Sequence, residues 1–220
     1  MLYGCTGVIF DFNGTLFFDS DKHVKAWNKL AEEIRGYGIS EEELQNHFYG
    51  VPNNEAIKYL MQTHVSDEEL TKYSRLKESY YREFCKEDIQ NFHLVEGAVP
   101  FLGILKENGI PFTIASASIK ENIDFFVETF GLNKWIQPEN IIYDNGTYEN
   151  KKMMFLDAAK VIGRPIEECL VFEDSESGIR DALAAGCKNI VVMDSMSVGK
   201  KYLGQQGIVA VEKDMVHVLV

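Results

Sequence analysis

The second half of the chain alternates short apolar runs with amphipathic segments, and this order constrains the fold more than any other feature of the sequence. The apolar runs are rich in Val, Ile and Phe and end in small or polar residues, as buried strands do. Segments with helical periodicity separate them. Strands that alternate with helices form a parallel sheet with helices packed on both faces. We therefore predict an α/β fold, a doubly wound (Rossmann-like) parallel sheet.

The alternation is interrupted once, by a helical stretch that follows the first predicted strand. Residues 19–93 hold several segments of helical periodicity and almost no runs of β-branched residues. Ser40 and Ser66 each precede a turn rich in acidic residues, which is typical of helix N-caps. We predict an α/β core domain formed by residues 1–18 and 94–220, with an inserted helical cap domain at 19–93.

Charge and composition limit the classes of partner that we expect for this chain. The 220 residues carry a formal net charge of −12, which argues against nucleic acid or an anionic membrane as a partner. No apolar window is long enough to predict a membrane span, and the N-terminus is typical of a core strand rather than a signal peptide. The four cysteines form no Cys-x-x-Cys pair, which indicates free thiols and a cytoplasmic protein.

Polar residues end three of the predicted strands and begin one of the predicted helices. They are Asp11, Ser116 and the pair Glu173 and Asp174 at strand ends, and Lys151 at the start of a helix. Each alone could serve as a cap or turn residue. The carboxyl ends of parallel strands, however, meet at one edge of the sheet, where ligands bind in such folds. The full set therefore predicts a single site.

Phosphoryl transfer is the chemistry that fits this set. An aspartate can attack phosphorus and form an aspartyl-phosphate, so Asp11 is the candidate nucleophile. Carboxylates are preferred ligands of Mg²⁺, and Lys151 would neutralise the nucleophile and the phosphate. The candidate phosphate-binding groups are the hydroxyl of Ser116, the N–H of Ala117, the backbone at Gly14 and the hydroxyl of Thr15.

Four stretches of the sequence resemble the haloacid dehalogenase superfamily: "DFNGT", "IASAS", the lysine before "MMFLDAAK", and "VFEDSESGIRDALAAG". The resemblance covers nearly the whole chain and is closest to beta-phosphoglucomutase and related small phosphatases, which carry a helical cap after the first motif. It implies that Asp11 is the nucleophile and that Mg²⁺ is the cofactor. It also implies that Asp11, Glu173 and Asp174 hold the metal together with the backbone carbonyl of Asn13.

Asn13 departs from the family pattern, which usually has a second aspartate at this position. That aspartate protonates the leaving oxygen and later activates water. An amide can do neither, and lost general acid–base catalysis typically costs ~10²–10⁴ in rate. A fast leaving group, or a water held by Asn13 or His23, could hide part of the loss.

Two further departures concern the substrate and the site lysine. In "YGVPNNEAI" the arginine that grips a second phosphate in the mutases is matched by Asn53, which favours a phosphatase and is a candidate substrate contact. The usual Lys-Pro-x-Pro loop has lost its prolines, and we favour Lys151 as the site lysine, with its neighbour Lys152 as a candidate phosphate contact. His23 and Trp27 lie one helical turn apart, where the family places the same pair, so His23 is a candidate substrate contact.

The function that we predict is Mg²⁺-dependent hydrolysis of a small phosphomonoester, such as a sugar phosphate, through an aspartyl-phosphate. One alternative is a beta-phosphoglucomutase-type sugar-phosphate mutase. Another is a catalytically impaired phosphate-binding module, for which Asn13 is the only sign. Metal-free dehalogenation would share the nucleophile but has no need of Glu173 and Asp174. We expect a small phosphorylated metabolite as the partner, and a monomer or weak dimer.

Overall fold

The computed structural model describes residues 2–219 and divides into two compact units. The first, the core unit, runs through Phe18 and resumes at His93. The second, the cap unit, spans Asp19–Phe92. The second boundary lies one residue earlier than the sequence analysis places it.

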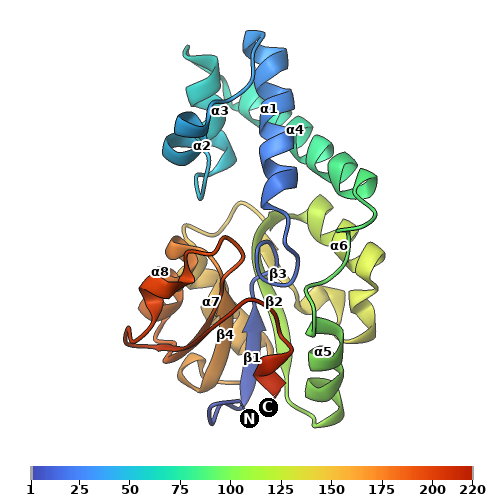
Figure 1. Ribbon diagram of the computed structural model, residues 1–220, viewed down its shortest axis with the longest axis vertical. Coiled ribbons are helices and arrows are strands. Elements are labelled where there is room, and N and C mark those ends of the chain that lie inside the picture. Colours follow the sequence, from blue (N-terminus) through green and yellow to red (C-terminus); the bar gives the residue numbers. More distant parts are fainter. Residues whose placement is uncertain (1, 220) are drawn as a thin grey trace. The chain divides into compact units, whose positions relative to one another are not determined.

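The core unit is built on a parallel sheet, which confirms the predicted α/β class (Figure 1). Across the sheet the strand order is β3-β2-β1-β4-β5-β6, the order of a doubly wound fold. The strands are β1 (Gly7–Phe10), β2 (Phe112–Ile119), β3 (Ile142–Asp144), β4 (Cys169–Glu173), β5 (Asn189–Met193) and β6 (Ile208–Glu212).

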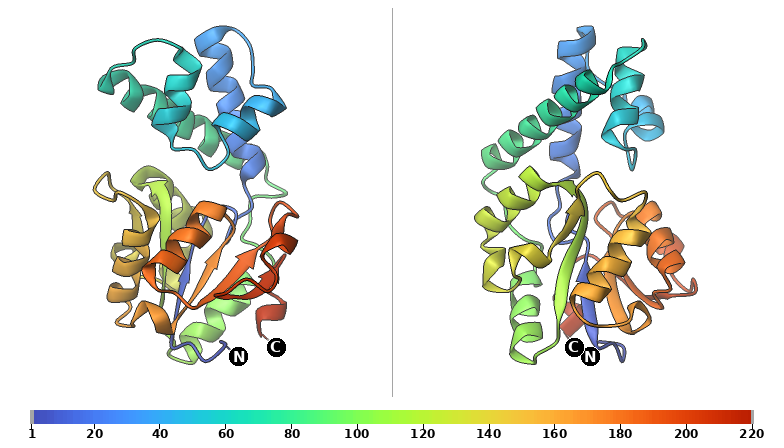
Figure 2. Two further views of the ribbon diagram at one scale, coloured as in Figure 1. Left: turned by 90° about the vertical axis from the view of Figure 1, so that its left-hand side faces the viewer. Right: turned by 180° about the vertical axis from the view of Figure 1, so that it is seen from behind.

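Helices cover both faces of this sheet. They are α5 (Ala98–Glu107), α6 (Lys120–Phe130), α7 (Lys151–Val161) and α8 (Glu176–Ala185). In the right-hand view of Figure 2, α5 and α6 lie on one face and α7 and α8 on the other. The period-two alternation of β1 explains this division: Phe10 packs on Phe101 of α5, whereas Ile9 joins a core cluster with Phe155 of α7.

The central strands place the site. β1 pairs with β2 on one side and with β4 on the other, and Phe10 lies in register with Phe172. The chain leaves β1 for β2 and later returns to add β4 on the opposite side of β1. Because the connections after β1 and β4 run in different directions, the sheet has its switch point there. Asp11 follows Phe10 and Glu173 follows Phe172, so both carboxylates lie at this point.

The cap unit is helical, with α1 (Ser20–Arg35), α2 (Glu41–His47), α3 (Asn53–Met61) and α4 (Asp67–Glu87) around an apolar cluster that includes Trp27. Ser40 and Ser66 form complete capping boxes with Glu43 and Glu69, which confirms both as N-caps. No helix among the described residues is both long and apolar enough to cross a membrane.

Candidate active site

Asp11 sits at the start of a tight loop that the core holds firmly. Its backbone N–H donates to the carbonyl of Phe172 over 2.9 Å. The carbonyl of Phe12 accepts from the N–H groups of the next turn, and the Phe12 ring stacks on Phe126 of α6 with centroids 4.1 Å apart. Gly14 adopts φ +74°, a left-handed conformation that suits glycine. The loop therefore presents Asp11 in a fixed position at the sheet edge.

Asp11 meets Glu173 and Asp174 as expected from their strand-end positions. One ligand atom from each of the three lies within 4.8 Å of the others. Glu173 is fully buried, and its Oε2 accepts from the N–H (2.7 Å) and hydroxyl (3.0 Å) of Ser175. A Cβ at Gly178 would collide with the Glu173 carboxylate, and one at Gly14 would collide with that of Asp174. Both glycines are needed for the carboxylates to occupy these places.

Lys151 is the lysine that reaches this cluster. Its Nζ donates to Oδ1 of Asp11 over 2.6 Å and also to Oε1 of Glu173. Lys151 is the first residue of α7, and its own N–H donates to Oδ2 of Asp181 on α8 over 3.1 Å. The neighbouring Lys152 is exposed on the helix surface. The structure therefore brings Lys151 to the candidate site and leaves Lys152 away from it.

Burial and charge shape the protonation of this pair. Burial raises the pKa of Asp11 to about 7, because the lowering effect of Lys151 only partly offsets desolvation and Glu173 adds to the rise. Burial alone would lower the pKa of Lys151, but attraction to Asp11 and Glu173 outweighs it and raises that pKa above its ordinary value. Lys151 is thus a fixed positive charge beside the candidate nucleophile.

The site residues fit a divalent cation. Three carboxylates and one lysine converge here, so with all three carboxylates ionised a dication would balance the remaining charge. Hard carboxylate oxygens are the donors that Mg²⁺ prefers. Glu173 approaches the backbone closely at Gly178, and Asp174 does so at Gly14, which leaves no room for a Cβ at either position. Asp11, Glu173 and Asp174 are therefore the residues that could hold Mg²⁺.

The serine motif at the end of β2 reaches Asn13. The register of β2 with β3 shifts between Ser116 and Ile119, so the chain bulges there, as strands often do beside active sites. Ser116 Oγ lies 3.4 Å from Oδ1 of Asn13, and Ser118 Oγ donates to the same atom over 2.7 Å. Ala117 is exposed between them. The bulge gathers both hydroxyls around the position where the family usually has an acid.

Thr15 is a predicted phosphate-binding residue with an unusual environment. It is fully buried, and its hydroxyl has no hydrogen-bond partner among residues 2–219. An unpartnered buried hydroxyl is uncommon in folded proteins.

The two cap residues predicted to contact substrate belong to one polar cluster within the cap unit. Nδ2 of Asn53 donates to Oε1 of Glu78 over 2.8 Å and to the hydroxyl of Ser74 over 3.1 Å. Lys77 donates to the same Glu78 oxygen over 2.8 Å and lies 2.7 Å from Nδ1 of His23. Lys77 and Glu78 are both almost fully buried. Burying such a pair seldom adds stability.

Asp19 does not act as a helix cap, although it lies directly before α1. Asp19 occupies the N-cap position of α1, but its side chain makes no capping hydrogen bond. Its Oδ2 instead accepts from the hydroxyl of Tyr81 over 2.5 Å, and it faces Nε2 of His23 at 3.4 Å. The ring of His23 stacks on that of Tyr81, with centroids 4.1 Å apart. Tertiary packing within the cap unit has taken the carboxylate away from the helix end.

Sequence reasoning missed four of these residues: Ser118, Asp181, Lys77 and Glu78. A signal for the last two was present, because Lys77 and Glu78 fall on the buried stripe of α4 that also carries Leu70 and Tyr81. Charged residues on an apolar stripe are rare and predict a paired, buried cluster. Ser118 and Asp181 gave no comparable signal, since nothing in their spacing identifies their partners.

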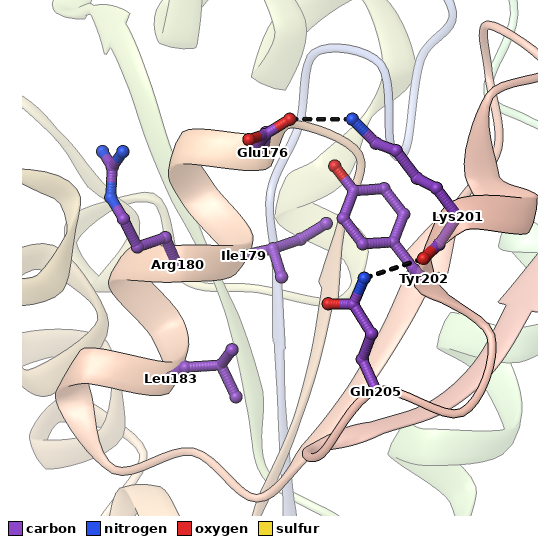
Figure 3. Close-up of a pocket in the computed structure, with 7 residues that line it drawn as sticks. All are labelled: Glu176, Ile179, Arg180, Leu183, Lys201, Tyr202 and Gln205. Atoms are coloured by element: carbon purple, nitrogen blue, oxygen red, sulfur yellow. Dashed lines mark hydrogen bonds and ion pairs between the residues drawn. The ribbon is translucent and has the colours of Figure 1, made fainter.

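A surface pocket of about 330 Å³ lies elsewhere on the core unit, between α8 and the 3-10 helix at Gly199–Tyr202 (Figure 3). Ile179 and Leu183 line it, and Glu176 pairs with Lys201 at 2.7 Å within it. None of the site carboxylates lines this pocket. The candidate active site is therefore the carboxylate–lysine cluster and not the pocket.

Comparisons with known proteins identify the family of this chain. The family model described as "Hydrolase: haloacid dehalogenase-like hydrolase" matches residues 5–186. Hexitol phosphatase A of Escherichia coli (strain K12) is 25% identical over 190 residues, covering 86% of this chain and 83% of that protein.

This chain is also similar to solved structures. A HAD hydrolase of family IA, variant 3, from Entamoeba histolytica is similar with a TM-score of 0.88 and 35% identity, covering 95% of this chain and 93% of that one. Beta-phosphoglucomutase from Clostridium difficile shares the fold, with a TM-score of 0.77 and 23% identity over 97% of this chain and 93% of that one.

Proposed function

Because the chain belongs to the haloacid dehalogenase-like hydrolases, we propose that it hydrolyses a small phosphomonoester, such as a sugar phosphate, through an aspartyl-phosphate. The single observation that carries this proposal is the contact of Lys151 with both Asp11 and Glu173 at the switch point of the sheet. A lysine that contacts both the candidate nucleophile and a carboxylate of the proposed metal site neutralises negative charge. An anionic phosphate is then repelled less.

Asp11 performs the first step of the proposed reaction. An oxygen of its carboxylate forms a bond to phosphorus while the bond from phosphorus to the ester oxygen breaks, and the departing alkoxide takes a proton from water to leave as the alcohol. Water then attacks phosphorus, which releases inorganic phosphate and restores the carboxylate. Asp11 must be ionised to attack, and Lys151 at 2.6 Å favours the ionised form. Ser116 and the backbone of the loop supply hydrogen bonds to the phosphate oxygens.

Mg²⁺ is the cofactor that we propose, held by Asp11, Glu173, Asp174 and the carbonyl of Asn13. When bound, it supplies positive charge to the phosphate oxygens and favours the ionised form of the carboxylates around it. Lys151 alone carries one positive charge against three carboxylates. The protein side of the site therefore remains anionic without a cation, and it would bind a phosphate ester poorly.

Asn13 sets the limits of this activity. Its amide cannot protonate a leaving alkoxide, so esters with poor leaving groups should react slowly. Its Oδ1 accepts from Ser118, which fixes the side chain beside the site. We propose that Asn13 orients water or the leaving oxygen by hydrogen bonding only.

Hydrolysis is favoured over the mutase alternative by the surroundings of Asn53. A mutase must bind a second phosphate, for which a free cationic side chain is suited. Asn53 instead donates to Glu78, and the nearby cation Lys77 is buried and already paired with that carboxylate. Burial raises the pKa of Glu78, but Lys77 and His23 outweigh it and bring that pKa to about 2, so this carboxylate stays charged. We propose that His23 and Asn53 contact the uncharged part of the substrate.

Phosphate release in the presence of Mg²⁺ tests the proposal. The substrates are p-nitrophenyl phosphate, sugar phosphates and hexitol phosphates, the last group suggested by the name of the Escherichia coli relative. We expect turnover above that of the Asp11→Ala variant, and its loss in chelator. A mutase would instead isomerise a sugar phosphate without releasing phosphate. If neither the unmodified protein nor Asn13→Asp released phosphate, the result would contradict the proposal and support a binding module.

A further inference from the structure

Lys151 is held at both ends, and the second attachment belongs to a residue with no assigned role. Its Nζ reaches Asp11 and Glu173, while its backbone N–H donates to Oδ2 of Asp181 over 3.1 Å. The other carboxylate oxygen of Asp181 lies 3.6 Å from Nε of Arg180. Asp181 is on α8 and Lys151 begins α7, so the contact links two helices at the candidate site.

The position of the Lys151 side chain depends on the backbone that carries it. The chain contains no proline between Pro138 and Pro165, so no ring fixes the backbone ahead of α7. The lysine side chain is long and flexible, and its tip can be placed only if the backbone that carries it is placed. A displacement of about 1 Å at a catalytic group can cost ~10²-fold in rate. The position of the first residue of α7 is therefore of direct consequence for the site.

Other hydrogen bonds near this segment do not fix it against the core. Asn150 caps α7 by accepting from the N–H of Met153 over 3.3 Å, and Tyr148 donates to Asp157 over 3.0 Å. Both partners belong to α7 itself, so these bonds move with the helix. Asp181 differs because it lies on another helix.

The helix that carries Asp181 is also the one that holds the carboxylate cluster. α8 begins two residues after Asp174, and its N-cap Ser175 donates to Oε2 of Glu173 over 3.0 Å. Ser175 therefore links the start of α8 to Glu173. Asp181 links α8 to Lys151, whose Nζ donates to Glu173. A carboxylate near the first turn of α7 is also favoured by the positive end of that helix.

We infer that Asp181 is a positioning residue, which fixes the start of α7 so that Nζ of Lys151 lies between Asp11 and Glu173. The inference rests on the proposed function, because the consequence of misplacing Lys151 is expected in phosphate-ester hydrolysis. Asp181 does not touch the reacting atoms and acts only through Lys151. If Asp181 only helped α7 to pack on α8, replacing it would affect Lys151 no more than it affects the other residues of α7.

The kinetic test uses p-nitrophenyl phosphate with Mg²⁺ and four variants: Asp181→Ala, Asp181→Asn, Lys151→Ala and the double variant Asp181→Ala/Lys151→Ala. We expect Asp181→Ala to lower kcat about tenfold or more, with a smaller change in KM. Asp181→Asn keeps a side-chain oxygen that can accept from the N–H of Lys151, so it should stay within about threefold of the unmodified protein. In the Lys151→Ala background, Asp181→Ala should change kcat less than about twofold, as expected for residues acting as one unit.

The matched control is Glu176→Gln. Glu176 is on the same helix and its carboxylate is also paired, but with Lys201 across the surface pocket (Figure 3). This variant should leave kcat unchanged. Thermal unfolding of every variant identifies any that fails to fold.

A second readout does not depend on activity. Amine acetylation followed by mass spectrometry reports how accessible Lys151 is, with the exposed Lys152 as an internal reference in the same peptide. We expect Asp181→Ala to raise labelling of Lys151 relative to Lys152 several-fold, and Asp181→Asn to leave the ratio near that of the unmodified protein. If the protein hydrolyses no phosphate ester, the proposed function fails while this ratio still tests the anchor. An unchanged ratio in Asp181→Ala, or an equal loss of kcat with and without Lys151, would overturn the inference.

Discussion

Ser118 donates a hydrogen bond of 2.7 Å to Oδ1 of Asn13, at the position where the family usually carries an acid. The bond orients the amide, whose N–H groups are too weakly acidic to protonate a leaving group. Asn13→Asp should therefore raise kcat, by up to ~10²–10⁴-fold for sugar phosphates, because the alkoxide that leaves needs a proton. The gain should be smaller for p-nitrophenyl phosphate, whose leaving group needs little assistance.

Comparing the two substrates tests whether residue 13 acts on the leaving group. Initial rates are taken for both proteins and both substrates, with Asp11→Ala as the blank. Equal gains on the two substrates would mean that residue 13 does not act on the leaving group.

Removal of the metal should abolish turnover, since Lys151 alone cannot balance Asp11, Glu173 and Asp174. We expect activity to vanish in excess chelator and to return when Mg²⁺ is restored. Mg²⁺ should also raise the melting temperature of the unmodified protein, because a ligand that binds only the folded state stabilises it. Glu173→Gln should lose this thermal shift, and Glu176→Gln, on the exposed side of α8, should keep it.

Gly178→Ala should inactivate the protein although alanine is the better helix former. An added Cβ would collide with the carboxylate of Glu173, which Ser175 and Lys151 hold in place. Gly103 on α5 is the matched control, because a Cβ there meets nothing within 4 Å. Gly103→Ala should stabilise the protein by about 0.5–1 kcal/mol and leave activity unchanged. Phosphate-release rates and thermal unfolding of the two variants give the comparison, and an active Gly178→Ala would contradict it.

Acid should destabilise the cap unit through Glu43. Hydrogen bonds from Arg35 and Ser40 lower the pKa of Glu43 from 4.5 to about 2, and burial opposes them only in part. A depressed pKa in the folded state means that the stabilisation is complete above pH 4.5 and is lost as the pH falls toward 2, because only the unfolded state takes up the proton over that range.

Thermal unfolding followed by circular dichroism between pH 2.5 and 7 measures this effect. Glu43→Gln should unfold at a lower temperature at pH 7, and the difference from the unmodified protein should shrink as the pH falls. Glu42→Gln, an exposed neighbour on the same helix, serves as the reference. A difference that stays constant across the pH range would show that the ionised form of Glu43 is not what stabilises the unit.

The elements of the fold could be predicted because their signals are local. Runs of buried residues alternate with helical periodicity in the core unit, and the sheet and helices follow that order. Ser40 and Ser66 act as N-caps through partners three residues away, so the sequence contained the whole motif. Asp11, Glu173 and Asp174 were predictable for a related reason: they end neighbouring strands, and parallel strands bring their carboxyl ends to one edge.

What the sequence determined by itself was therefore the class of fold, the order of its elements and the carboxylates that the sheet edge collects. Only the tertiary structure decided between Lys151 and Lys152, because successive residues at a helix start point about 100° apart and the orientation of α7 selects which one reaches Asp11. It also decided that Asp19 binds Tyr81 instead of capping α1, that Ser118 meets Asn13, and that Asp181 anchors Lys151. These contacts join residues that lie far apart in the chain, and their formation depends on how whole helices and strands pack, which no local pattern of residues specifies.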